Sequence, residues 1–223
     1  MDKKYIITLD GPAGAGKSTV AKELSKRLSY IYLDTGALYR AVAFKVIRDG
    51  ISSDDTAQFS EFCNKVRIRL DNVDGNMRVL VDDKDITDKI RTEKIGIMAS
   101  KISAIPIVRE MLYPVQREAG KNGGIVAEGR DMGTVIFPHA EVKFFLDASV
   151  DERALRRYRE LSAGGTRIAY EDVKRELIRR DKQDSERQIA PLIPSSEAVI
   201  IDCTNMTVMD VVDNIMSFIR SKL

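Results

Sequence analysis

A glycine-rich segment near the N-terminus has the residue types of a phosphate-binding loop. It reads Gly11-Pro-Ala-Gly-Ala-Gly16-Lys17-Ser18 and matches the pattern GxxxxGK[ST]. Glycines let backbone N–H groups surround phosphates, the lysine can reach the β- and γ-phosphates, and the serine hydroxyl can bind Mg²⁺. We therefore expect a nucleoside triphosphate to be bound by Gly11, Pro12, Ala13, Gly14, Ala15, Gly16, Lys17, Ser18 and Thr19, with Ser18 as the metal-binding residue.

This loop does not specify which nucleotide binds or what happens to it. A switch GTPase would also be expected to contain a guanine-reading NKxD segment, and the sequence contains none. A kinase for a small molecule is therefore favoured over a regulatory nucleotide-dependent switch, which remains the alternative from a different class.

Arginines suit the acceptor half of a kinase site, because they bind phosphate bidentately and stay charged. Arg40 follows the second expected strand and Arg130 follows the third, at the strand ends where open α/β sheets bind ligands. Further arginines crowd residues 151–188, but acidic residues lie among them. Many of these could therefore be i,i+4 partners on solvated helices.

The periodicity of apolar residues predicts the elements that must position these groups. Strands are expected at residues 5–10, 30–33, 124–128, 142–147 and 198–202, and helices at 17–29, 36–48, 92–121 and 207–223. The helical pattern at 92–121 should break near Pro106. The order strand, glycine loop, helix, strand begins a right-handed parallel α/β fold. We expect one domain over residues 1–223, with five parallel strands flanked by helices.

Two segments depart from this alternation. Residues 60–90 contain apolar residues at every second position on either side of the turn DNVDGN, which predicts a small antiparallel, β-rich insertion. Residues 151–188 are helical and arginine-rich, interrupted by the flexible stretch SAGGT at 162–166.

Composition excludes several classes of protein. The 36 basic and 34 acidic side chains give a net charge of +2, which offers no global attraction to nucleic acid or to an anionic membrane. The longest apolar runs fall far below the roughly 20 residues that span a bilayer. Cys63 and Cys203 lie far apart, without CxxC spacing. We expect no disulfide, no cysteine zinc site and a cytoplasmic location.

Four motifs together resemble bacterial-type cytidylate kinase, a nucleoside monophosphate kinase family. They are LDTGALYRA at 33–41, EGRDMGTVIFP at 128–138, DERALRRYREL at 151–161 and RRDKQDSERQIAPL at 179–192. The resemblance covers nearly the whole chain. It implies transfer of the γ-phosphoryl group of ATP to CMP or dCMP with Mg²⁺, by a protein that we expect to be a monomer. It also implies a nucleoside-monophosphate-binding region at about residues 35–110 and a lid at about 150–170.

The resemblance also assigns roles by matched position. Lys17, Arg130 and Arg187 become the catalytic residues. The acceptor nucleotide is assigned Arg40, Arg130 and Arg187 for its phosphate, Asp184 and Arg180 for its sugar, Ser100, Arg109 and Asp131 for its base, and Thr35 nearby. Arg153 and Arg157 become candidates for the ATP phosphates. Two positions depart slightly, because Glu128 stands where aspartate is expected and Thr35 where serine is also common.

The chemistry of cytosine agrees with the base-reading assignment. Cytosine presents an amino donor beside two acceptors, which suits a carboxylate and an arginine, whereas uracil would place a carbonyl against Asp131. Such a mismatch can cost several powers of ten in specificity. A kinase of UMP, AMP or a non-nucleotide acceptor remains the alternative enzyme.

Two single residues invite a chemical role. His139 is the only histidine, but phosphoryl transfer to an existing phosphate needs no general base, so we expect it in a surface loop. Asp147 at the end of the fourth core strand could be a metal-associated carboxylate, or it could cap the following helix within DASVDE; capping is favoured.

Overall fold

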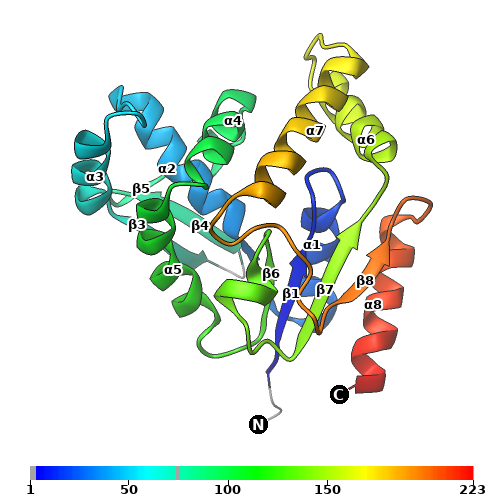
Figure 1. Cartoon of the computed structure of the whole chain (residues 1–223). Coiled ribbons are helices and arrows are strands. Elements are labelled where there is room, and N and C mark those ends of the chain that lie inside the picture. Colours follow the sequence, from blue (N-terminus) through cyan, green and yellow to red (C-terminus); the bar gives the residue numbers. More distant parts are fainter. Residues whose placement is uncertain (1–3, 74–75, 223) are drawn as a thin grey trace.

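A five-stranded parallel sheet forms the centre of the computed structural model, which describes residues 4–73 and 76–222 (Figure 1). Its strands lie in the order β2-β6-β1-β7-β8. Their bounds are β1 (Ile6–Asp10), β2 (Ile31–Asp34), β6 (Ile125–Glu128), β7 (Val142–Asp147) and β8 (Val199–Asp202). All neighbouring pairs are parallel. The five expected core strands are thus confirmed, and β1 occupies the middle with its glycine loop at the carboxyl edge.

Helices cover both faces of this sheet. Helix α1 (Lys17–Leu28) follows the glycine loop directly and packs beside α8 (Val208–Lys222). Val211, Val212 and Ile215 on α8 are buried, as the periodicity predicted, whereas Val208 is 38% exposed. Leu223, which the expected helix also included, lies outside the described residues. Cys63 and Cys203 are both buried free thiols.

A small antiparallel sheet of order β3-β4-β5 lies beside the parallel sheet in the fold (Figure 1). It is formed by β3 (Ile68–Val73), β4 (Asn76–Val81) and β5 (Lys84–Asp85), followed by a short 3₁₀ turn, η1 (Thr87–Lys89). The β-rich insertion is therefore present, with residues 74–75 of its expected turn outside the described residues. Its first residues instead belong to helix α3 (Thr56–Lys65), whose buried Phe59, Phe62 and Cys63 lie at helical spacing.

Three more helices complete this region. Helix α2 (Thr35–Asp49) begins directly after β2, and its first turn is capped by Asp34, which accepts from the backbone N–H of Ala37. Helices α4 (Glu93–Ile102) and α5 (Pro106–Gly120) are separate, and Pro106 is the first residue of α5. The break predicted near this proline is confirmed, and Pro106 takes the first helical position, where its missing N–H costs no hydrogen bond. The helix nevertheless continues through a second proline, Pro114, in its interior.

Helices α6 (Val150–Ala163) and α7 (Tyr170–Glu186) form a hairpin above the carboxyl edge of the sheet (Figure 1). Gly165 adopts a positive φ of 80° in the connection, within the stretch predicted to be flexible. The N-cap of α6 is Ser149, which accepts from Glu152 N. The capping role favoured for Asp147 is therefore wrong. Its exposed carboxylate accepts only from the N–H of the next residue, because the chain continues two residues further before turning helical.

Among the described residues, no helix is long and apolar enough to cross a membrane.

Candidate active site

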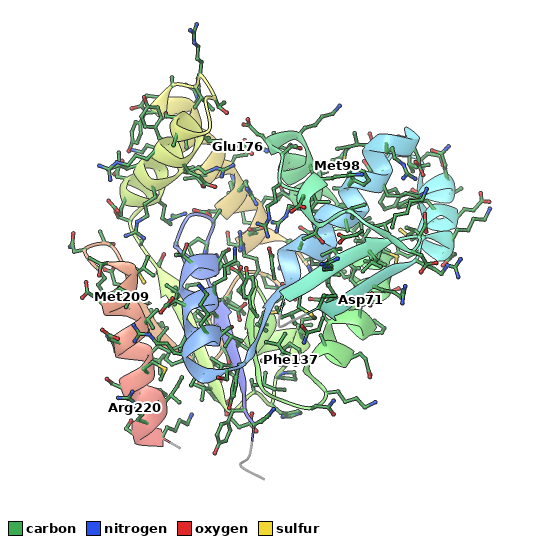
Figure 2. The ribbon with its side chains drawn as sticks, turned by 180° about the vertical axis from the view of Figure 1, so that it is seen from behind. Asp71, Met98, Phe137, Glu176, Met209 and Arg220 are labelled. Atoms are coloured by element: carbon green, nitrogen blue, oxygen red, sulfur yellow. The ribbon has the colours of Figure 1, made fainter. Side chains whose placement is uncertain are left out.

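A single cleft of about 930 Å³ lies at the carboxyl edge of the parallel sheet. Its walls come from the glycine loop, the start of α2, the end of α4, and the hairpin of α6 and α7. Figures 1 and 2 view the molecule from opposite sides, and in both α4 and α7 face each other. Most residues singled out from the sequence line this cleft: Ala13, Gly14, Ala15, Gly16, Lys17, Ser18, Thr19, Thr35, Arg40, Ser100, Arg109, Arg130, Asp131, Arg157, Arg180, Asp184 and Arg187. Gly11, Pro12 and Arg153 lie behind its surface.

The glycine loop owes its shape to backbone conformations that favour glycine. Gly11, Gly14 and Gly16 have φ values of 145°, 78° and 89°. A Cβ at Gly11 would also lie 2.0 Å from the carbonyl oxygen of Leu146, so the loop can pass this close to β7 only without a side chain. The loop and the first turn of α1 together form an anion-binding end of a helix.

Lys17 lies at the base of this loop with 6% of its surface exposed, and its ammonium donates to the carbonyl oxygen of Pro12 at 2.6 Å. Burial, followed by the positive charge of Arg130, lowers the pKa of Lys17 to about 7. A polyphosphate beside it would favour the protonated form. The lysine is therefore placed to receive anionic oxygen atoms.

Oxygen atoms gather on the side of the loop where Ser18 lies. Burial, followed by the charge of Asp34, raises the pKa of Glu128, while Lys17 and the Ser18 hydroxyl act in the opposite direction. The hydroxyl of Tyr32 donates to the Glu128 carboxylate, and that of Thr35 donates to the Glu128 carbonyl at 2.7 Å. In the part of the chain that the structure describes, no three His, Cys, Asp or Glu residues form a metal-binding group. A serine hydroxyl beside one carboxylate fits Mg²⁺, which keeps water and substrate phosphates among its ligands.

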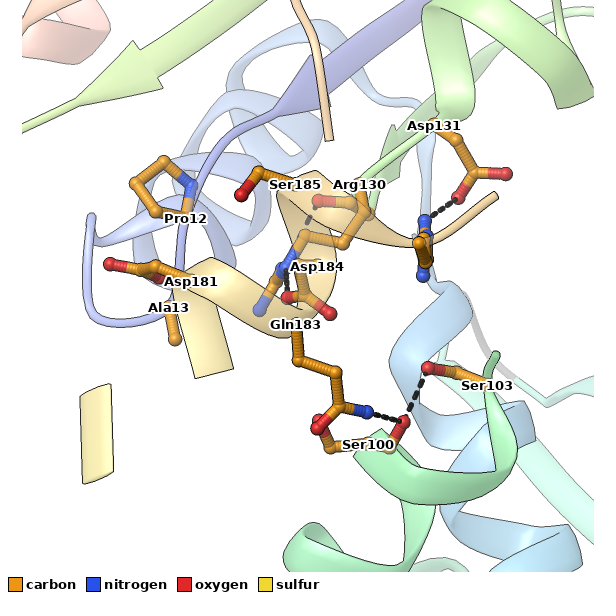
Figure 3. Close-up of polar contacts among 12 residues, drawn as sticks. Pro12, Ala13, Ser100, Ser103, Arg130, Asp131, Asp181, Gln183, Asp184 and Ser185 are labelled. Atoms are coloured by element: carbon orange, nitrogen blue, oxygen red, sulfur yellow. Dashed lines mark hydrogen bonds and ion pairs between the residues drawn. The ribbon is translucent and has the colours of Figure 1, made fainter. Parts of the chain in front are cut away.

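Arginines from α2, from the segment after β6 and from α7 line the centre of the cleft. Arg130 donates to the Asp184 carboxylate at 2.8 Å, and Arg40 donates to Asp34 at 2.7 Å (Figure 3 shows the first pair). The Nε atoms of Arg40 and Arg180 are buried without a hydrogen-bond partner. Burial, followed by the charge of Arg130, lowers the pKa of Arg180. Unpartnered guanidinium donors held near other positive charges form a site for an anion.

A recess of the same cleft is lined by Ser100, Ser103, Arg109 and Asp131. Arg109 is 1% exposed and pairs there with the buried carboxylate of Asp131. Its Nη1 atom also donates to the Ser103 carbonyl at 3.0 Å. Arg187 lies 3.5 Å from the same carboxylate. The hydroxyl of Ser100 is buried without a partner. The recess therefore offers a hydroxyl, a guanidinium and a carboxylate to a small planar ligand with mixed donors and acceptors.

The two arginines matched to the ATP phosphates lie in different surroundings. Arg153 is buried behind the glycine loop, where its guanidinium donates to the carbonyl of Ala13 at 3.0 Å and pairs with Asp181 at 2.6 Å. Arg157 pairs with Glu160 and lines the cleft. Arg156, which sequence reasoning did not single out, also lines the cleft and donates to the Cys203 carbonyl at 2.7 Å.

Asp10 was also missed. Its buried carboxylate accepts from the N–H groups of Met132 and Gly133 at 2.9 and 2.8 Å, at the start of a π-helical turn, η2 (Met132–Ile136). The residue therefore joins the glycine loop, which follows it directly, to the segment that carries Arg130 and Asp131. Its place at the end of a core strand was the only signal in the sequence.

His139 is exposed in the loop before β7, as expected, and does not line the cleft.

Comparison with known proteins relates this sequence to one family. The family model described as cytidylate kinase matches residues 7–221. A cytidylate kinase from Citrifermentans bemidjiense is 47% identical over 98% of this chain and 94% of its own length. Another from Pediococcus pentosaceus is 45% identical over 99% of this chain and 98% of its own length.

Two solved structures with a similar fold are much more distant in sequence. An uncharacterized protein from Eubacterium ventriosum has a TM-score of 0.53 at 14% identity, over 98% of this chain and 99% of its own. A gluconokinase from Sinorhizobium meliloti has a TM-score of 0.51 at 13% identity, over 100% of this chain and 95% of its own. At these identities the similarity shows the fold alone.

Proposed function

The chain belongs to the cytidylate kinase family, and we propose that it transfers the γ-phosphoryl group of ATP to CMP or dCMP, yielding ADP and CDP or dCDP. The observation that carries this proposal is the content of one cleft. It is lined by a phosphate-binding glycine loop, by a group of partly unpartnered arginines and by a recess containing Ser100, Arg109 and Asp131.

On the donor side, the loop N–H groups and Lys17 bind the ATP phosphates, with Arg157 as a candidate from the lid. Arg153 is better suited to support the loop from behind, because its donors are already bonded to Ala13 and Asp181. Ser18 would hold Mg²⁺ with the phosphates and water, and the ion would neutralise charge on the transferred group.

On the acceptor side, Arg40, Arg130 and Arg187 bind the monophosphate, while Arg180 and Asp184 bind the sugar. The acceptor oxygen is already anionic, so it needs no general base. The contribution of this chain is then to hold the ATP triphosphate and the acceptor monophosphate in line and to neutralise their repulsion, which lowers the barrier through positioning and electrostatics.

The base is read in the recess. A carboxylate oxygen of Asp131 can accept from the cytosine amino group, while Arg109 and the free hydroxyl of Ser100 can meet its acceptors. UMP would place a carbonyl oxygen against the same carboxylate. A UMP or AMP acceptor is therefore disfavoured, and so is a nucleotide-dependent switch, which would need no such recess.

The regions that move on binding follow from this assignment. We assign the acceptor-binding region to about residues 35–110 and the lid to about residues 150–170, which contain all of α6 and its connection to α7. Closure of the lid would exclude water and favour transfer over hydrolysis. The enzyme would act as a monomer in the reducing cytoplasm, where Cys63 and Cys203 remain thiols.

An assay of ADP release with ATP and Mg²⁺ tests the proposal against a panel of acceptors: CMP, dCMP, UMP, AMP, GMP and shikimate. We expect efficient turnover only with CMP and dCMP. Preferred turnover of another acceptor would replace the assigned substrate, and ADP release with none of them would favour the switch.

A further inference from the structure

The last turn of α7 contacts two different walls of the cleft through adjacent residues. Asp184 binds Arg130, which follows the core strand β6. The preceding residue, Gln183, donates from its side-chain amide to the carbonyl oxygen of Ser100 on α4, at 2.7 Å (Figure 3). This hydrogen bond joins α4 to α7 across the cleft.

The Ser100 carbonyl depends on side chains for its hydrogen bonds. It lies in the last turn of α4, where carbonyl groups lose their helical partners. The N–H of Ala104, which would continue the helical pattern, donates to Lys101 instead. The Ser100 carbonyl accepts from the Ser103 hydroxyl at 2.8 Å and from Gln183. Gln183 therefore supplies a cap for α4 from across the cleft.

The capped turn carries groups assigned to base recognition. The Ser100 hydroxyl belongs to the same residue, is buried in the recess and has no partner. The carbonyl of Ser103, three residues on, accepts from Arg109, and Arg109 in turn pairs with Asp131. A shift of this turn would therefore displace the Ser100 hydroxyl and the Arg109 guanidinium together, relative to the Asp131 carboxylate.

We propose that Gln183 is a positioning residue that sets nucleobase specificity: its amide fixes the Ser100–Ser103 turn against α7 so that the pyrimidine-reading groups stay in register with Asp131. This inference rests on the proposed function. Gln183 need not touch the substrate. Its neighbour Asp184 holds Arg130, so one helical turn would align the base-reading and phosphate-binding halves of the acceptor site.

The test compares Gln183→Met, which keeps the length but removes the donor, with Gln183→Glu, which keeps the shape but turns an acceptor toward the carbonyl. Lys182→Met is the matched control, because Lys182 is the exposed neighbour on the same helix. For each protein, kcat and KM are measured for CMP, UMP and ATP, and thermal unfolding is recorded.

We expect the KM for CMP to rise about tenfold in Gln183→Met, because the loss of one hydrogen bond typically weakens binding by about this factor. The KM for CMP should rise further in Gln183→Glu. The preference for CMP over UMP should fall in parallel, with the KM for ATP unchanged and Lys182→Met behaving like the unmodified protein. Unchanged CMP preference in both Gln183 variants would overturn the inference, as would equal losses for both nucleotides with lowered thermal stability. Failure of the proposed function would be seen separately, as absence of CMP turnover in the unmodified protein.

Discussion

The side chains of Arg109 and Asp131 form an ion pair that is closed to solvent, with 1% and 4% of their surfaces exposed. Taking both charges out of water is costly, and removal of one partner from such a pair usually destabilises a protein by about 3–5 kcal/mol. A pair of this kind is weak evidence for stability. Its position in the acceptor recess gives it a more specific use, because a fixed carboxylate can distinguish an amino group from a carbonyl.

Replacement of Asp131 by asparagine should reduce the preference for CMP over UMP by about a hundredfold, since a neutral amide can turn a donor toward the uracil carbonyl. The variant should also unfold more easily, because Arg109 would keep its burial and lose its countercharge. Ratios of kcat/KM for the two nucleotides measure the first effect. Asp54→Asn is the control, since Asp54 pairs with Lys101 while 81% exposed. Equal losses for CMP and UMP would remove Asp131 from base recognition.

Replacement of Arg187 by alanine should lower kcat by about a thousandfold, because one of the charges that neutralise the acceptor phosphate is lost. Stability should change little, because Asp131 keeps its pairing with Arg109, and because removal of Arg187 relieves the burial and the repulsion by Arg109 that lower the pKa of its guanidinium. Steady-state kinetics and thermal unfolding test both points. Arg179→Ala serves as the control on the exposed face of α7. Turnover within twofold of the unmodified protein would contradict the assigned role.

The two arginines of α6 should respond differently to replacement by methionine. Arg153→Met leaves the carbonyl of Ala13 and the carboxylate of Asp181 without their donor, so we expect a loss of about 2 kcal/mol in the free energy of unfolding and a higher KM for ATP. Arg157→Met should raise the KM for ATP with no loss of stability, because Arg157 pairs only with the exposed Glu160. Urea unfolding and ATP kinetics separate the two. Equal stability of both variants would argue against the supporting role of Arg153.

Asp10 should make stability depend on pH in a defined direction. Burial raises the pKa of Asp10 to about 6 from 3.8, against the opposing effect of its two backbone hydrogen bonds. Between these values the folded state holds a proton that the unfolded state has released, so the free energy of unfolding falls as pH rises, by about 3 kcal/mol in total.

The Asp10→Asn variant lacks this titration. The difference in unfolding free energy, unmodified protein minus variant, should therefore decrease between pH 4 and pH 6 and level off above, as measured by urea unfolding. Asp147→Asn is the control, since Asp147 ends the neighbouring strand β7 and is exposed. A difference that stays constant or increases with pH would contradict the raised pKa.

The core of the fold was predictable because its signals are local. Alternation, buried strand runs and the glycine loop lie within short windows, and Pro106 marks the start of α5 directly. Helix α3 was missed because the period-2 pattern of the strands after it dominated the prediction for residues 60–90, although Phe59, Phe62 and Cys63 have helical spacing. The N-cap before α6 was misplaced by two residues, since Asp147 and Ser149 are both good capping types.

The site was predictable where a residue stands at a strand end or in a motif. Arg40, Arg130 and Asp131 satisfy that condition, and all three line the cleft. Asp10 also ends a core strand, and Arg156 and Gln183 lie within two of the motifs, but these positions did not identify their roles, because the roles depend on partners 122, 47 and 83 residues away. The residues next to each of them in the sequence do not indicate which distant partner it contacts. Arg153 was matched to the ATP phosphates from its position in the lid. That position did not reveal that its guanidinium already donates to the carbonyl of Ala13, at the back of the glycine loop.

The most direct test of the central claim follows the phosphoryl group itself. Incubation with CMP, Mg²⁺ and ATP labelled with ³²P at the γ position should produce labelled CDP in amounts equal to the ADP formed, with little labelled inorganic phosphate. Label that accumulates in inorganic phosphate, or in a nucleotide other than CDP when CMP is offered beside UMP and AMP, would contradict the assignment of this cleft as a cytidine monophosphate kinase site.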